Sequence, residues 1–197
     1  MATAANRVEA LRWRPRTRMW GMLAVAVAGT LGFGAIGEWR DGHALLINTT
    51  DSLPNWAFLI QRHKLPARGD YVFFDPPPGE LLRRHFGAKP QMFGKIAYGV
   101  PGDIISNIGR TVAVNGHPVA QMKPFTRFGE PLTPGATGRV PAGCYFAATP
   151  HKDGFDSRYG EIGFVCGRQI IGTGEPSVSS QPDHRLNPCQ QKTADPF

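Results

Sequence analysis

Cysteine is scarce in this 197-residue chain, and the patterns that mark a metal or redox centre are missing. The three cysteines form no Cys-x-x-Cys motif and no Cys/His cluster, which argues against a zinc site. The six histidines are scattered, as is usual for surface or structural residues. The sequence therefore predicts neither a metal nor a cofactor.

A broadly distributed positive charge is also missing, although the formal net charge is +7. Residues 1–18 hold five arginines against Glu9, a net +4, so the other 179 residues carry only +3. These arginines are Arg7, Arg12, Arg14, Arg16 and Arg18. Nucleic-acid binding needs a dense basic patch or stripe. The sequence therefore predicts no nucleic-acid partner.

Charge is absent altogether from residues 19–37, which include the apolar run Met-Leu-Ala-Val-Ala-Val-Ala. Nineteen helical residues span about 28 Å, close to the hydrocarbon thickness of a bilayer. Trp20 and Trp39 flank the segment, and the arginines before it predict a cytoplasmic N-terminus of residues 1–18. A signal peptide cleaved near Ala26-Val27-Ala28 is the main alternative, and a buried core helix is a weaker one.

Beyond the membrane segment, 24 glycines and 18 prolines in the chain favour strands and turns over long helices. Only Gly79–Gly87 has helical spacing of its apolar residues. We expect one mostly β domain over residues 38–173 and a flexible tail over 174–197. The expected strands are Ala44–Asn48, Tyr71–Phe74, Phe93–Val100, Thr111–Val114 before an Asn-Gly turn, Gly143–Ala148 and Gly163–Ile171.

All three cysteines, Cys144, Cys166 and Cys189, follow the membrane segment and so lie on its predicted exported side. An odd number in an oxidising compartment permits one disulfide and leaves one thiol over. Cys144 and Cys166 flank one apparent hairpin and are candidates to pair.

Five short motifs follow one another in the order found in one enzyme family. They are Thr50-Asp51-Ser52-Leu53-Pro54, Arg68-Gly69-Asp70-Tyr71-Val72, Gly94-Lys95-Ile96 with Gly99-Val100-Pro101-Gly102-Asp103, Val114-Asn115-Gly116, and Val140-Pro141-Ala142-Gly143 with Asp156-Ser157-Arg158-Tyr159. In this order, behind an N-terminal membrane segment, they resemble the motifs of the type I signal peptidases. The resemblance covers about residues 19–173, with segments 76–92 and 120–139 too variable to compare. It implies a signal-peptidase-like β-fold catalytic domain.

The chemistry explains why a serine and a lysine are needed. A serine hydroxyl is a weak nucleophile until a base removes its proton, and no convincing histidine partner lies near a matching motif. The candidate nucleophile is Ser52 and the candidate base is Lys95, whose apolar neighbours can lower its pKa by burial. Alone, Ser52 could be a turn cap and Lys95 a snorkelling or paired side chain.

The resemblance also assigns supporting residues. The family's oxyanion hole uses the nucleophile's backbone N–H and a hydroxyl two residues earlier, which here are Ser52 and Thr50. Asp156 and Arg158 correspond to an ion pair that braces the active-site wall. Without the resemblance, this pair reads as a solvated turn pair that contributes almost no stability.

Departures from the general pattern point to a subgroup. The last motif normally opens Gly-Asp-Asn-Arg, but this chain has 148–151 as Ala-Thr-Pro-His, and it has Gly154 where leader peptidases place a lysine-contacting serine. Residues 48–52, Asn-Thr-Thr-Asp-Ser, are similar to the TraF-type conjugal-transfer pilin peptidases. In that group Ser, Lys and Asp residues are implicated, so Asp156 becomes a third catalytic candidate and orients Lys95.

The prediction is therefore a serine endopeptidase that processes an exported pilin precursor for conjugative transfer, with possible cyclisation of the product. It would be a single-pass protein of the bacterial inner membrane with its catalytic domain in the periplasm. A general signal peptidase acting on many preproteins is the alternative enzyme. An inactive assembly component of a secretion apparatus is the alternative from another class, and a soluble self-cleaving Ser/Lys regulator is disfavoured by the membrane segment.

Overall fold

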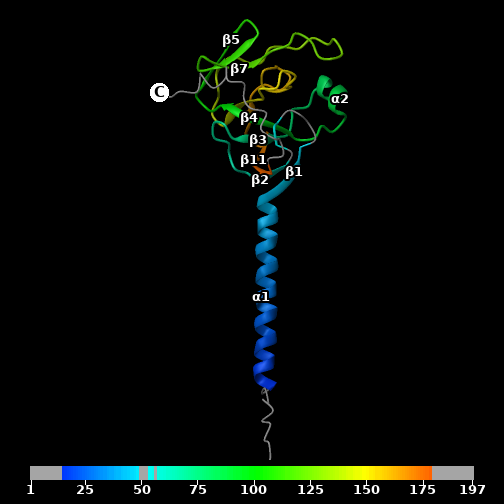
Figure 1. Cartoon of the computed structure of the whole chain (residues 1–197), viewed down its shortest axis with the longest axis vertical. Helices are drawn as coiled ribbons and strands as arrows, with labels where there is room; N and C mark the ends of the chain where they lie inside the picture. Colours follow the sequence, from blue (N-terminus) through cyan, green and yellow to red (C-terminus); the bar gives the residue numbers. More distant parts are fainter. Residues whose placement is uncertain (1–14, 49–52, 56, 179–197) are drawn as a thin grey trace, which may run out of the picture. The chain divides into compact units, whose positions relative to one another are not determined.

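The computed structural model describes residues 15–48, 53–55 and 57–178. The chain divides into two compact units, residues 1–41 and 42–197. The first unit contains most of helix α1 (Pro15–Gly42), which Figure 1 shows as one uninterrupted helix.

Helix α1 carries the predicted membrane segment and is longer than the uncharged run. Its section Arg18–Gly42 has 25 residues with a mean hydropathy of 1.7, and it is the one helix among the described residues that is long and apolar enough to cross a bilayer. None of its apolar window is buried within the protein, unlike the core helix of a soluble domain. The helix continues past Gly37 because nothing in the charged turn that follows breaks the backbone hydrogen bonding.

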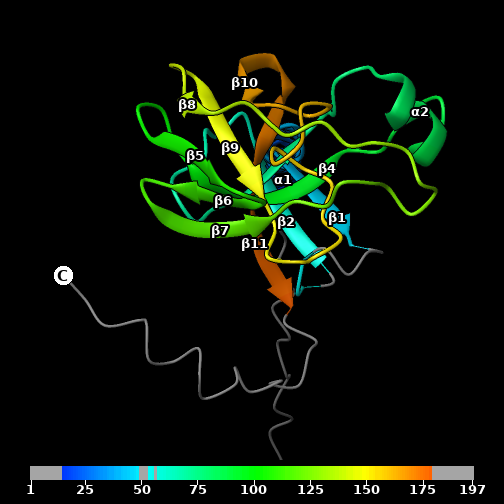
Figure 2. The same cartoon turned by 90° about the horizontal axis from the view of Figure 1, so that it is seen from above.

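The second unit is built mainly of antiparallel strands in two sheets (Figure 2). The seven-stranded sheet has the order β1 (His43–Ile47), β2 (Ala57–Arg62), β11 (Ile170–Val178), β3 (Tyr71–Phe74), β4 (Phe93–Gly99), β9 (Cys144–Ala148) and β10 (Val165–Cys166). The four-stranded sheet has the order β7 (His117–Gln121), β6 (Thr111–Val114), β5 (Ile104–Ile108) and β8 (Gly138–Arg139). The remaining elements are α2 (Glu80–Phe86) and the 3-10 helix η1 (Gly167–Gln169). The predicted mostly β fold is confirmed.

Strand β4 lies inside the larger sheet, between β3 and β9. Its residues alternate between buried and half-buried, with Lys95, Ala97 and Gly99 on the buried side. The core on this face includes Val72 and Phe74 of β3. A lysine at this register therefore enters an apolar core and not solvent.

The predicted Asn-Gly hairpin is present between β6 and β7. Asn115 and Gly116 have φ values of 51° and 83°, the left-handed conformation that a two-residue hairpin turn requires at both positions. The side chain of Asn115 also accepts a hydrogen bond from the backbone N–H of Ile104 at 2.8 Å, which joins the turn to β5.

The predicted boundary of the tail at Gly174 is wrong by five residues. Strand β11 continues to Val178 and pairs with β2, with Gly174 opposite Ile60 and Val178 opposite Ala57. Residues 174–178 read as loop because they are rich in turn formers, and a register irregularity between Pro176 and Val178 accommodates the proline. The described part of the domain therefore extends to residue 178.

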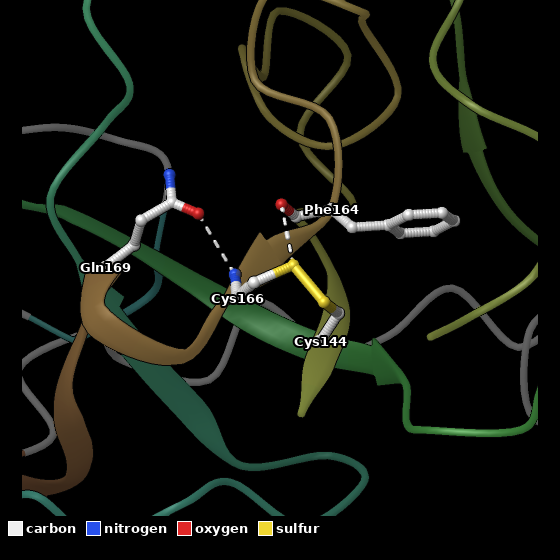
Figure 3. Close-up of a disulfide and its surroundings, with 4 residues drawn as sticks. All are labelled: Cys144, Phe164, Cys166 and Gln169. Atoms are coloured by element: carbon white, nitrogen blue, oxygen red, sulfur yellow. Dashed lines mark hydrogen bonds between the residues drawn. A yellow bond between two sulfur atoms is a disulfide. The ribbon is translucent and has the colours of Figure 1, made fainter. Parts of the chain in front are cut away.

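Cys144 and Cys166 form a disulfide between β9 and β10 (Figure 3), so the predicted candidate pair is confirmed. The two residues are directly opposite each other in the ladder, with Cα atoms 4.0 Å apart. The Cys166 backbone N–H donates to the Gln169 side-chain oxygen at 3.0 Å, which holds the turn into β11. Cys189 lies outside the described residues.

Candidate active site

Lys95 lies in the middle of β4 and is paired across the ladder with Val72 of β3. Its neighbour Gly94 allows two side chains to approach the backbone closely. A Cβ atom at Gly94 would lie 2.7 Å from a ring carbon of Phe73 and 3.0 Å from a methyl carbon of Leu53, so only glycine fits without a shift. Leu53 is 6% exposed and directly follows Ser52 in the chain. The residue after the candidate nucleophile thus packs against the residue before the candidate base.

Asn48 links the two ends of the segment 49–52, which precedes Leu53. Its side-chain amide donates hydrogen bonds to the carbonyls of Leu53 and Asn55, at 3.1 and 3.0 Å. Because these bonds join β1 to residues beyond the 49–52 segment, they bring its two flanks close together. Ser52 and Thr50 themselves lie outside the described residues.

Burial controls the electrostatics of Lys95, which is 5% exposed. Loss of hydration lowers the pKa of its ammonium below the ordinary value of 10.5, the Asp156 carboxylate acts in the opposite direction, and the Arg158 guanidinium lowers it further. The Nζ atom lies 5.7 Å from the centroid of the Phe93 ring. The environment therefore favours the neutral amine, the form that can accept a proton.

Asp156 and Arg158 form a buried ion pair, at 0% and 1% exposure. The guanidinium donates to both carboxylate oxygens, from Nε at 2.8 Å and from Nη2 at 2.9 Å. The backbone N–H of Thr149 donates to the same carboxylate at 3.0 Å. Such a bidentate, fully desolvated pair is unlike the solvated turn pair considered from sequence, and its geometry suits a bracing role.

Arg158 also connects the two sheets around the site. Its Nη1 donates to the carbonyl of Gln121, the last residue of β7, at 2.9 Å, and its Nη2 donates to the carbonyl of Thr149 just beyond β9. The guanidinium therefore has partners on both sheets as well as on Asp156.

Packing explains why residue 154 is a glycine, which the sequence did not reveal. A Cβ atom at this position would lie 2.3 Å from the Thr149 methyl group and 2.9 Å from both an Asp156 oxygen and an Arg158 nitrogen. The ion pair and Thr149 thus occupy the space that a serine side chain would need. No side chain can therefore act on Lys95 from position 154, and the charged groups that act on it are Asp156 and Arg158.

Three of the sequence motifs meet at Asp103, away from the ion pair. Its carboxylate accepts hydrogen bonds from Arg68 at 2.8 Å, from the Asn115 side chain at 2.8 Å and from the Val100 backbone N–H at 2.7 Å. The Arg68 hydrogen bond is the main reason that the pKa of Asp103 falls to about 2. These motif residues anchor the end of β4 to the turn between β6 and β7, which makes them structural.

Of the five predicted site residues, the structure places Lys95, Asp156 and Arg158 in one electrostatic environment. Sequence reasoning expected the apolar neighbours of Lys95 in its own strand, Phe93 among them, but missed the contributions of Asn48 and Leu53 and the packing of Phe86 on Phe93. The position of Leu53 between Ser52 and Pro54 was the sequence signal that could have indicated its contribution. Among the described residues, no group of three His, Cys, Asp or Glu side chains is arranged to hold a metal ion.

Comparison with known proteins covers most of the chain. Residues 18–178 match the family described as "Signal peptidase, peptidase S26". Among solved structures, the crystal structure of a signal peptidase I from Enterococcus faecalis aligns with 56% of this chain and 97% of its own, with 24% sequence identity and a TM-score of 0.35. No curated protein sequence matches the chain.

Proposed function

The chain belongs to the peptidase S26 family of signal peptidases, and we propose that it is a membrane-anchored serine endopeptidase that uses Ser52 as nucleophile and Lys95 as general base. The observation that supports this dyad most directly is the packing of Leu53 against Gly94. These residues are the immediate chain neighbours of Ser52 and Lys95, so the contact joins the two motifs. The low exposure of Lys95 supports the second requirement, an amine whose pKa is lowered by burial.

In the proposed mechanism, the Lys95 amine accepts the Ser52 hydroxyl proton as the oxygen attacks the scissile carbonyl carbon. The resulting oxyanion accepts hydrogen bonds from the Ser52 backbone N–H and the Thr50 hydroxyl. When the tetrahedral intermediate collapses, the C–N bond breaks and the leaving amine takes the proton from Lys95. Water then hydrolyses the acyl-enzyme, with Lys95 acting again as the base.

Asp156 has a supporting electrostatic role in this proposal. Its charge favours the protonated form of Lys95, and the Arg158 guanidinium acts in the opposite direction. In this proposal the carboxylate helps to stabilise the ammonium that forms on proton transfer, while Arg158 limits its effect on the pKa of Lys95.

We further propose that α1 is retained as the anchor and that residues after it lie in the periplasm of a bacterial inner membrane. The length and hydropathy of Arg18–Gly42 support a membrane span. The five arginines of residues 1–18, which precede the uncharged run, support a cytoplasmic N-terminus. A substrate that is itself exported and membrane-associated would then reach the catalytic domain on the same side.

The substrate class that we propose is a pilin precursor of a conjugative system. Two sequence departures support it: the TraF-like segment at residues 48–52, and Gly154 in place of serine. The structure adds that Asn48 bonds across this segment and that Gly154 is required by packing. In such an enzyme a substrate amine, held in place, could replace water and give a cyclic product.

The dyad is tested by substituting each member in the full chain. Ser52→Ala and Lys95→Ala should each abolish cleavage while the protein stays folded and membrane-bound. Lys64→Ala removes an exposed lysine and serves as the matched control, with unchanged activity. A serine-directed acylating probe should label the wild type and the control but not Ser52→Ala. Cleavage by either dyad variant would refute the mechanism, and no cleavage or labelling by the wild type would favour an inactive assembly protein.

The substrate class is tested by comparing cleavage of pilin precursors with cleavage of unrelated preproteins. A pilin-specific enzyme should process its cognate precursor and few others. Mass spectrometry should show whether the product is linear or lighter by one water, as a cyclic pilin would be. A linear product would remove the cyclisation step, and efficient cleavage of many preproteins would support a general signal peptidase.

A further inference from the structure

Helix α2 places an aromatic ring at the edge of the Lys95 environment. Phe86, the last residue of α2, contacts Phe93 with ring centroids 5.0 Å apart and Phe155 with centroids 5.9 Å apart. Phe93 is the ring beside the Lys95 ammonium, and Phe155 immediately precedes Asp156. The three rings therefore form one patch that includes neighbours of both charged groups in the site.

Three contacts fix α2 in this position. Leu82, one helical turn before Phe86, is 1% exposed and lies in the same core cluster as Phe93 and Phe155. On the other side, Glu130 bridges to Arg84 at 2.8 Å and to His85 at 2.5 Å. Figure 2 shows the loop between β7 and β8, which carries Glu130, running out to α2. The helix is thus held against the domain by the buried Leu82 and by the contacts of Glu130 with Arg84 and His85.

We infer that Phe86 is a positioning residue of the proposed active site, whose ring covers Phe93 and Phe155 and thereby keeps water away from the Lys95 side chain. The inference rests on the proposed function of Lys95 as the base. Phe93 and Phe155 are only partly buried, so they need a cover if the core beneath them is to stay dry. Phe86 is 44% exposed, which means that one side of its ring faces solvent while the other lies on these two residues.

The charges around this patch make the inference testable. The charged groups that act on Lys95 are Asp156 and Arg158, which lie on the β9 side. On the α2 side, Glu80 pairs with Arg83 and Arg84, and Glu130 contacts Arg84 and His85, so these groups are engaged with one another. Phe86 carries no charge, so truncating it admits water without removing a charged group; its ring contact with His85, with centroids 6.4 Å apart, is lost as well, and Phe128 shares such a contact. Water stabilises the ammonium more than the amine, so truncation should raise the pKa of Lys95.

The test measures kcat/KM against pH for the full chain with a peptide that the wild type cleaves. Because the base must be neutral, Phe86→Ala should move the acid limb upward by about half a pH unit or more. Phe86→Leu, which keeps an apolar cover, should restore most of the wild-type profile. Phe128→Ala is the matched control, because Phe128 is 80% exposed and contacts His85 instead. An acid limb that does not move in Phe86→Ala would overturn the inference, even if the rate falls.

An NMR titration of the Lys95 side chain separates this inference from the proposed function. The ¹³Cε shift, followed in detergent micelles, reports the protonation of Lys95 without requiring cleavage. An upward shift of the midpoint in Phe86→Ala supports the cover even in a chain that cleaves nothing, which would count against the peptidase proposal alone. An unchanged midpoint overturns the cover even in an active peptidase.

Discussion

Lys95 and Gly154 each occupy a position where the surrounding packing permits little else. Lys95 has 5% of its surface exposed and sits in a strand whose other inward residues are Ala97 and Gly99. Gly154 lies where any Cβ would meet the Asp156–Arg158 pair. A lysine that loses its hydration destabilises the fold unless it gives up its proton. A lysine in this core therefore lowers the stability of the fold, as is common for residues that serve a function.

Lys95→Met should stabilise the protein at pH 7 while abolishing activity. Burial lowers the pKa of Lys95 in the folded state below 10.5, its ordinary value in the unfolded chain. At a pH between the folded-state pKa and the unfolded-state pKa, the unfolded chain therefore binds a proton that the folded chain does not. The free energy of unfolding therefore rises with pH across that window in the wild type, and this component disappears with Met. We expect a gain of about 0.5–2 kcal/mol, measured by chemical denaturation. Lys64→Met should change little, and a loss of stability in Lys95→Met would contradict the assigned burial cost.

Gly154→Ser tests whether the serine of leader peptidases can be accommodated. The new Cβ would collide with the Thr149 methyl group, so the ion pair must shift, and we expect a loss of about 1–3 kcal/mol in the free energy of unfolding. Adding Thr149→Ser removes that methyl group and should recover part of the loss. Thermal denaturation of the single and double variants measures both effects. If Gly154→Ser is as stable as the wild type, Thr149 and the Asp156–Arg158 pair can shift without cost, which would contradict this expectation.

The end of β4, in one sheet, is linked to the start of β5 and the end of β6, in the other sheet, by hydrogen bonds to one carboxylate. Asp103, in the turn after β4, joins Arg68 and Asn115 to the backbone of Val100. This link fixes the end of the strand that carries Lys95. The residues around Asp103 come from three sequence motifs. These parts of the motifs therefore have a structural role and not a catalytic one.

Asp103→Asn should weaken this link in a way that depends on pH. The pKa of Asp103 is lowered from 3.8 to about 2, so its contribution is present above pH 3.8 and is lost as the pH falls through about 2. At pH 7 we expect the variant to lose about 1–3 kcal/mol of stability, because three donors lose a charged acceptor. Near pH 2 the two proteins should unfold with similar midpoints. Asp75→Asn, an exposed control, should match the wild type throughout, and a pH-independent difference for Asp103→Asn would contradict the charge argument.

The whole molecule combines one apolar helix with one β domain, and each unit sets a different part of the proposed function. In the proposed topology the helix, which is long and apolar enough to cross a bilayer, would hold the domain at a membrane surface and so limit its substrates. The domain supplies the buried lysine and its braced wall, and a disulfide joins two of its strands. A stable disulfide is typical of exported domains, which agrees with the proposed periplasmic location.

Topology can be measured with reporter fusions. Alkaline phosphatase joined after residue 178 should be active, because the five arginines of residues 1–18 retain the N-terminus in the cytoplasm. Replacing these five arginines by glutamine should reduce that activity by weakening the orientation signal. An inactive reporter in the wild-type fusion, with an active cytoplasmic reporter at the same site, would reverse the proposed orientation.

Local patterns in the sequence predicted the elements whose signals are local. The apolar segment became α1, Tyr71–Phe74 became β3, and Asn115-Gly116 became a hairpin turn. The order of the motifs predicted the family, which the match over residues 18–178 confirms. Helical length, strand alternation and turn conformation depend on neighbouring residues, so one sequence carries enough information for them.

Tertiary structure decided the features that depend on distant residues. Strand β2 and the end of β11 at 174–178 are strands because they pair with each other, although neither segment was predicted. Gly154 is explained by Thr149 and the ion pair, and the cover over Phe93 comes from a helix in a segment that matched no motif. The dry surroundings of Lys95 likewise require β3, β9 and α2 together. Close approach and burial are properties of the assembled fold, so residue spacing alone does not reveal them.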